Sequence, residues 1–242
     1  MDPDSQIRAE RIFVAKMIPL LSSFYFGSVE HYRFLARYPK VIIDTGEHYE
    51  RQSYRTRTRI IGPNGRQDLS IQIVHDHGKK MRMRDVRLSY AETWPAQHLH
   101  AIRSAYGQTP WFIHYIDEIE AVVMKKYDLM IDLQLATMAL GMKWLGIKTE
   151  VFVSESYVEV DEYRVGKGGL GPVDYTTPST ERIRLLDLRN SFHPKKPLPA
   201  GVTPVPPYTQ VFADRHGFIP RSSIIDLVCN AGPEATHYLT RI

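Results

Sequence analysis

Cysteine is scarce in this sequence, with Cys229 the single one among 242 residues. One thiol excludes an internal disulfide and a zinc site built from several cysteines, and it is typical of proteins from a reducing cytosol. Long apolar runs are also absent, since no stretch approaches the roughly 18–20 residues that a membrane-spanning helix needs. The N-terminus is acidic at Asp2 and Asp4, and Lys16 and Pro19 interrupt its apolar run. We therefore predict a cytoplasmic protein without a signal peptide or membrane insertion.

The chain as a whole lacks a strong excess of either positive or negative charge. Thirty-one Lys and Arg residues against 27 Asp and Glu give a formal net charge of +4, which is mild for a nucleic-acid-binding domain. The basic residues are nevertheless concentrated, because residues 51–87 contain ten of them and only three acidic residues. We expect an anionic ligand near this segment.

Residues 12–43 predict a parallel βαβ unit. A mostly apolar run at 12–21, ended near Pro19, is typical of a buried strand, and Ser22 or Ser23 can cap a helix that runs to about Ala36. Residues 41–43 then form a second buried strand. Sites in open α/β sheets gather outside the carboxyl ends of the strands, which places five polar residues on that edge: Ser22, Ser23, Asp44, Glu47 and His48.

Residues 54–75 predict a β-hairpin around Asn64-Gly65. With those two residues as the loop, Ile60 lies opposite Leu69, and the arginine-rich face meets Ser70 and Gln72. The arginines would then have no acidic residue opposite them, which favours binding of an anion.

The rest of the chain predicts mainly helices. Apolar residues recur at helical spacing over 91–106, 111–126 and 128–145, followed by a strand at 149–153, a glycine-rich loop at 161–180, a strand at 208–212 and a helix at 219–230 capped by Ser222 or Ser223. The predicted fold is α/β (or α+β), with central helices 91–145 that cover a mixed sheet. We predict one domain over 1–242, with 91–146 as an alternative helical subdomain.

The candidate site centres on residues 47–59. Glu47 and His48 form a carboxylate–histidine pair suited to general acid–base catalysis, and Arg55, Arg57 and Arg59 alternate as in a strand with one cationic face. Guanidinium groups on one face bind phosphate or carboxylate through bidentate hydrogen bonds. The alternatives are a loop histidine with structural hydrogen bonds and a solvated sheet face.

Other candidates carry weaker signals. His98 shares a helix face with Trp94 and is typical of a satisfied, partly buried histidine; His75 and His77 could bind a metal but lack a third ligand. The glycine-rich residues 166–169 lack P-loop spacing. Cys229 lies in an apolar helix and favours packing over a nucleophilic role.

Three groups of residues carry a family resemblance. Residues 49–57 (YERQSYRTR) precede Pro63-Asn64-Gly65 and 69–71; Trp94 and His98 occur with 105–107 and Asp187-Leu188-Arg189; and 206–212 (PPYTQVF) leads to 217–220, 223–227 and 232–234. From Pro19 to Leu239 the chain thus resembles the WbqC-like protein family. Two residues depart from the family pattern, Arg51 in place of lysine and Cys229 in place of phenylalanine. Arginine stays protonated, so Arg51 cannot act as a neutral amine base.

The resemblance implies a place in polysaccharide or O-antigen biosynthesis and, for some members, glycine transfer. We therefore expect an amide-forming acyl transferase that moves an amino acid, such as glycine, to a sugar or related metabolite. His48 would be the base, oriented by Glu47 or Asp44, and Tyr54 would position the substrate or donate to the oxyanion. Substrate or anion binding would involve Asp44, Arg51, Gln52, Arg55, Arg57, Arg59, His98 and, from the resemblance, Tyr208 and Gln210.

No Walker motif or Rossmann glycine fingerprint is present. We therefore expect no bound cofactor and an activated donor made elsewhere, either aminoacyl-tRNA or a carrier-protein thioester, with a small-molecule acceptor. Two alternatives stay open: a non-catalytic module that binds an anionic carbohydrate, nucleotide-sugar or RNA, and a metal-assisted hydrolase that uses His75 and His77.

Overall fold

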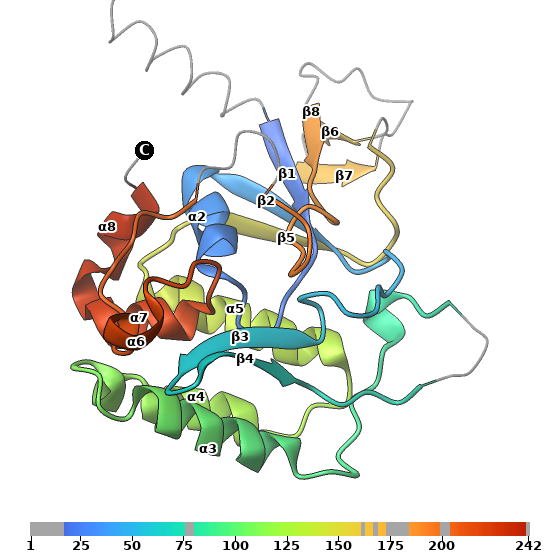
Figure 1. Ribbon diagram of the computed structural model, residues 1–242. Helices are drawn as coiled ribbons and strands as arrows, with labels where there is room; N and C mark the ends of the chain where they lie inside the picture. The colour runs from blue at the N-terminus through green and yellow to red at the C-terminus, as the bar shows by residue number, and fades with distance from the viewer. Residues whose placement is uncertain are drawn as a thin grey trace, which may run out of the picture.

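A computed structural model describes residues 17–75, 80–160, 163–166, 169–172, 184–198 and 204–240. Its largest sheet has four parallel strands, β1 (Met17–Leu21), β2 (Lys40–Asp44), β5 (Glu150–Ser154) and β8 (Arg184–Asp187), in the order β5-β2-β1-β8 (Figure 1). The chain adds β2 and β5 on one side of β1 and β8 on the other. This reversal beside β1 is where open α/β sheets commonly form a binding crevice.

The predicted βαβ unit is confirmed, since α2 (Val29–Arg37) connects the parallel strands β1 and β2. The predicted cap was wrong: Ser28 caps the helix, and its hydroxyl accepts from the backbone N–H of His31. Ser22 and Ser23 are instead buried in the preceding loop, where they bond to Glu47 and Gln134. The strand also continues beyond Pro19 to Leu21.

The predicted hairpin is present as β3 (Arg57–Gly62) and β4 (Gly65–Ser70), but its register differs by two residues. Pro63 and Asn64 form the loop, and Gly65 adopts a φ of 89°. Proline fixes φ near −65°, as the first central position of a type I turn requires, and the following glycine takes the left-handed conformation. Asp68 therefore lies opposite Arg59, where the prediction placed Ser70.

The central helices are confirmed as α3 (Trp94–Tyr106), α4 (Ile116–Met124) and α5 (Met130–Trp144), with a short 3₁₀ turn, η2, at Phe112–His114. Helix α3 packs against β3 and α4, and α4 packs against α5. Figure 1 shows these helices grouped around the hairpin. The α/β (or α+β) class is confirmed, with the parallel strands and the hairpin strands in separate sheets.

The C-terminal part differs more from the prediction. The glycine-rich segment contains a short hairpin, β6 (Tyr163–Gly166) and β7 (Gly169–Pro172). Residues 208–212 form no strand, so that prediction was wrong. The side chain of Gln210 bonds instead to the backbone of Ile219: its Nε2 donates to the carbonyl oxygen at 3.0 Å, and its Oε1 accepts from the N–H at 2.8 Å. The remaining elements are η1 (Met83–Asp85), α6 (Ala213–His216), α7 (Ile224–Ala231), η3 (Gly232–Glu234) and α8 (Ala235–Thr240). Ser223 caps α7, one of the two predicted caps.

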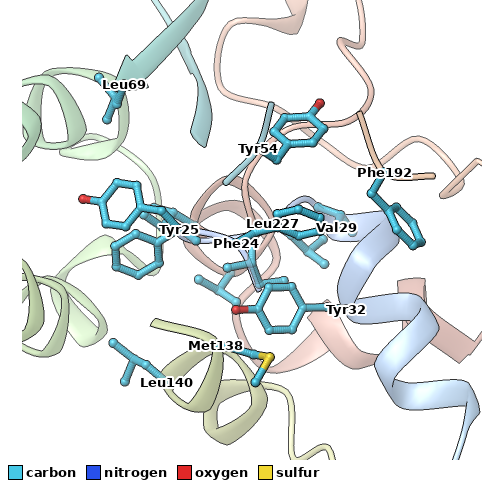
Figure 2. Close-up of a cluster of buried hydrophobic side chains, with 14 of the residues drawn as sticks. Phe24, Tyr25, Val29, Tyr32, Tyr54, Leu69, Met138, Leu140, Phe192 and Leu227 are labelled. Carbon is cyan, nitrogen blue, oxygen red and sulfur yellow. The ribbon is translucent and has the colours of Figure 1, made fainter. Parts of the chain in front are cut away.

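One hydrophobic cluster is shared by these elements. It includes Phe24 from the loop after β1, Tyr32 from α2, Leu69 from β4, Met138 from α5 and Leu227 from α7 (Figure 2). Helices α3 to α5 contribute to the same core as the parallel sheet. Cys229 is fully buried in it, and burial raises the pKa of the thiol, as a packing role requires. Among the described helices, none has the length and apolarity needed to cross a bilayer.

Helix α5 passes close to α2 at Gly141, and this contact makes a stability prediction. A Cβ at Gly141 would overlap the ring of Tyr32, which is fully buried. We expect Gly141→Ala to lower the free energy of unfolding by about 1–3 kcal/mol, although alanine favours a helix over glycine. Urea unfolding measures the effect. At exposed Ala139 the reverse change, Ala139→Gly, should cost about 1 kcal/mol from propensity alone. A stabilised Gly141→Ala variant would contradict the described contact.

Candidate functional site

Arg55 is the centre of the polar cluster at the carboxyl edge of the parallel sheet, and its side chain is only 1% exposed. Its Nε and Nη2 donate to the two oxygens of Glu47 at 3.1 and 2.8 Å. Nη2 also lies 2.8 Å from Ser22 Oγ and 3.1 Å from the carbonyl oxygen of Arg189, while Nη1 donates to Glu50 at 3.2 Å. One guanidinium therefore connects the segments that follow β1, β2 and β8.

Ser22 closes this cluster from β1. Its hydroxyl lies 2.5 Å from Glu47 Oε1 and 2.7 Å from the Arg189 carbonyl oxygen, so its proton serves one acceptor at a time. Burial raises the pKa of Glu47, although the bonds from Arg55 and Ser22 favour the charged carboxylate. A buried carboxylate with this many donors is suited to fixing the loop rather than exchanging protons with a ligand.

A second guanidinium, that of Arg189, lies beside the first. It donates to Asp44 at 2.6 Å and to both oxygens of Asp187 at 3.0 and 2.6 Å, and it stacks 4.4 Å from the ring centre of Tyr157. Burial alone would raise the pKa of Asp187, but the hydrogen bonds from Arg189 outweigh it and lower that pKa. The other oxygen of Asp44 accepts from the backbone N–H groups of Gly46 and Glu47, which fixes the turn after β2.

The three alternating arginines predicted to bind an anion all have carboxylate partners. Arg55 is held by Glu47 and Glu50, and Asp68 lies 3.5 Å from Arg57 and 3.0 Å from Arg59. The prediction that no acid faces the hairpin arginines was wrong, because the actual turn shifts Asp68 opposite Arg59. The argument that these arginines bind a ligand because no acid faces them therefore no longer holds.

His48 has a different environment from the one predicted. It is exposed, and its imidazole makes no hydrogen bond within the described residues; Glu47 and Asp44 are occupied by Arg55 and Arg189, so the expected orientation of His48 by a carboxylate was wrong. Its backbone pairs with that of Arg82. The flanking bonds, Tyr49 N–H to Met81 and Met83 N–H to Glu47, are those of a non-hydrogen-bonded antiparallel pair. In such a pair the two side chains share one face with Cβ atoms about 4.5–5.5 Å apart.

Several predicted site residues belong to buried structural networks. Tyr54 is 3% exposed, and burial raises its pKa; its hydroxyl accepts from Arg59 at 3.4 Å. Tyr208 and Gln210 both donate to the buried carboxylate of Asp226, at 2.5 and 2.7 Å. Within the described residues no hydrogen bond joins any of these three side chains to His48. Their predicted catalytic or binding roles stay predictions.

His98 matches the alternative interpretation of a satisfied histidine. Its Nε2 lies 3.2 Å from the Ser70 carbonyl oxygen, which can only accept, so Nε2 carries the proton. Its Nδ1 then accepts from the Tyr25 hydroxyl at 3.1 Å.

The loop after β8 contains residues that the sequence analysis did not place in the site. Asn190 accepts from Arg55 at 3.0 Å, and Lys195 donates to the Gln52 side chain at 2.8 Å. Gln52 is exposed and has a φ of 57°, an uncommon conformation for this residue. Arg51 beside it is exposed. A predicted strand at 184–187 would have placed this loop at the carboxyl edge of the sheet. That strand has only four residues, too few for a clear alternating pattern in the sequence.

The metal hypothesis gains no support from geometry. His77 lies outside the described residues, and within them no three His, Cys, Asp or Glu side chains are grouped to hold a metal ion. Of the glycine-rich tetrapeptide, Gly166 and Gly169 end β6 and begin β7, and Lys167 and Gly168 lie outside the described residues.

Comparison with known families defines the class of protein. The model of the WbqC-like protein family matches residues 23–167, which include α2, β2, the β3–β4 hairpin and the three central helices. This chain therefore belongs to the WbqC-like protein family. The matched region ends before residues 206–234, so their resemblance to the family stays a prediction. Neither the curated proteins nor the solved structures contained a match.

The buried histidine His98 makes a pH prediction. Burial lowers its pKa to about 4, from an ordinary value of 6.5. The unfolded chain therefore binds a proton near pH 6.5 while the folded protein does so only near pH 4, and stability falls as the pH drops through this window. We expect His98→Gln, which keeps a donor and an acceptor, to reduce the slope by up to about 1.4 kcal/mol per pH unit.

Urea unfolding between pH 7 and pH 4 measures this slope. His31, whose pKa burial lowers to about 3, continues to titrate in the variant and accounts for a remaining slope. The exposed His100→Gln is the control and should leave the profile unchanged. Equal slopes in wild type and His98→Gln would contradict the neutral buried state of His98.

Proposed function

We propose that this protein is an amide-forming acyl transferase that passes a pre-activated amino acid, such as glycine, to an amine on a sugar or related metabolite. The observation that carries the proposal is the position of His48: an exposed imidazole, free of hydrogen bonds in the described part of the chain, next to the cationic side chain of Arg82. In the buried polar cluster of the same loop, Glu47 is paired with Arg55 and Asp44 with Arg189. These bonds hold the loop in place, as the positioning of a catalytic group requires.

In the proposed reaction the acceptor enters as a neutral amine, and His48 removes one proton from its nitrogen as that nitrogen attacks. The amine nitrogen attacks the acyl carbonyl carbon, the C–N bond forms, and the C–O bond of an ester or the C–S bond of a thioester breaks. The proton held by His48 then passes to the leaving oxygen or sulfur, so the imidazole is regenerated. Arg82, on the same face, stabilises negative charge on the donor or on the tetrahedral intermediate.

The activated donor would be an aminoacyl-tRNA or a carrier-protein thioester, because the sequence contains no nucleotide-binding motif that would let the protein activate an acid itself. We place the reaction in the cytoplasm, where such donors are made. The single cysteine fits that compartment.

A non-catalytic binding module for an anionic ligand is the second candidate. One observation favours it: no carboxylate orients His48 within the described residues, and an unoriented imidazole is a weaker base catalyst. Both candidates require the same anionic partner, so product formation is what separates them.

The assay supplies purified protein with glycyl-tRNA or a glycyl thioester and an amino-sugar acceptor, and it measures the amide product by mass spectrometry. We expect His48→Ala to lower turnover by about 10²-fold, since proton transfer by a positioned side chain contributes about 10²–10⁴-fold. His100→Ala, which removes another exposed histidine, should retain full activity. Equal turnover of wild type and His48→Ala would remove His48 as the base; absence of product with every donor would favour the binding module.

A further inference from the structure

A pocket of about 570 Å³ opens beside the His48–Arg82 pair. Its polar lining comes from Lys80, Arg82, Arg87, His75 and Asp85. The volume lies within the range of roughly 300–1,000 Å³ that small-molecule sites occupy.

Backbone pairing fixes the two walls of this pocket. On one wall, the Val74 N–H donates to the Arg87 carbonyl at 2.9 Å, and Ile73 pairs with Leu88. On the other wall, the Tyr49 N–H donates to the Met81 carbonyl at 2.9 Å, which ties the pocket to the loop that carries His48. The cationic side chains therefore project from an ordered frame.

The cations of this pocket differ from the other arginines near the site. Lys80, Arg82 and Arg87 are exposed, and in the described ranges none of them has an ion pair or a side-chain hydrogen bond. Among the described lining residues Asp85 is the acidic one, and its Oδ1 lies 3.7 Å from Nε of Arg84. By contrast, Arg55, Arg57, Arg59 and Arg189 are each paired with a carboxylate. Of the concentrated basic charge of residues 51–87, the part at this pocket thus has no carboxylate partner within the described residues.

We propose that this pocket binds the phosphate group of a small phosphorylated metabolite, such as a nucleoside diphosphate or a molecule that contains one. Lys80, Arg82 and Arg87 line it, and guanidinium and ammonium groups bind phosphate through charge-assisted hydrogen bonds. The pocket is compact and bordered by Asp85, and the net charge of the chain is only +4, so the features favour a small ligand over an RNA backbone.

The inference rests on the proposed function for its place in the reaction. With the phosphate at Lys80, Arg82 and Arg87, the reactive end of the same molecule lies toward His48, because His48 and Arg82 share one face. The phosphorylated molecule is then the acceptor or the donor of the acyl transfer. Binding itself is measurable without turnover.

Isothermal titration calorimetry of the full chain with ADP and with inorganic pyrophosphate, at low salt, tests the proposal. We expect saturable binding that weakens about tenfold in each of Lys80→Ala, Arg82→Ala and Arg87→Ala, the loss typical of one charge-assisted hydrogen bond. The control is Arg66→Ala, an exposed arginine on β4 that does not line the pocket and changes the net charge equally. It should bind as the wild type does, and circular dichroism confirms that all variants fold.

Three results would overturn the proposal. No saturable binding of either probe, or an equal loss in Arg66→Ala, would show that the pocket is not a phosphate site. A short single-stranded RNA that displaces ADP at lower concentration, with a steep salt dependence, would make the surface a nucleic-acid site. ADP binding is measured without an acyl donor or acceptor, so failure of the acyl-transfer assay and failure of the phosphate site are distinguishable.

Discussion

The buried ion pair between Arg55 and Glu47 is the interaction on which the carboxyl edge of the sheet depends. Arg55 reaches Ser22 after β1, Glu47 after β2 and the backbone after β8, three segments that are distant in sequence. Two charges removed from water need close geometry and further hydrogen bonds to offset the loss of hydration, and this cluster provides both. Without Arg55, the carboxylate of Glu47 would lie buried and unpaired, and the three segments would lose their common partner.

This constraint also separates structural charge from charge that is free for a ligand. The buried guanidinium groups of Arg55, Arg59 and Arg189 are paired with four carboxylates, those of Glu47, Asp44, Asp68 and Asp187. The same loop turns Glu47 inward and leaves His48 outward beside Arg82. Backbone hydrogen bonds therefore hold the segment that carries His48 against the one that carries Arg82, while both side chains stay exposed.

The fold was largely predictable from local pattern, and the site was not. The βαβ unit and the three central helices follow from periodicity in long segments, whereas the hairpin register depended on whether Pro63 or Asn64 begins the turn. That two-residue difference placed Asp68 opposite Arg59 and contradicted the premise that the hairpin arginines face no acid. The sequence of alternating arginines is the same whether their partners are ligands or carboxylates of the protein. Arg189 and Arg82 join the candidate site through contacts between segments distant in sequence, which a local pattern cannot reveal.

A double-mutant cycle on Arg55 and Glu47 tests the central claim most directly. Arg55→Met, Glu47→Leu and the double variant are compared by urea unfolding at pH 7. We predict that each single change costs about 3–5 kcal/mol, because it leaves a buried charge without its partner, and that the double variant costs much less than the sum. Additive losses below about 1 kcal/mol each, as for an exposed pair, would contradict the account.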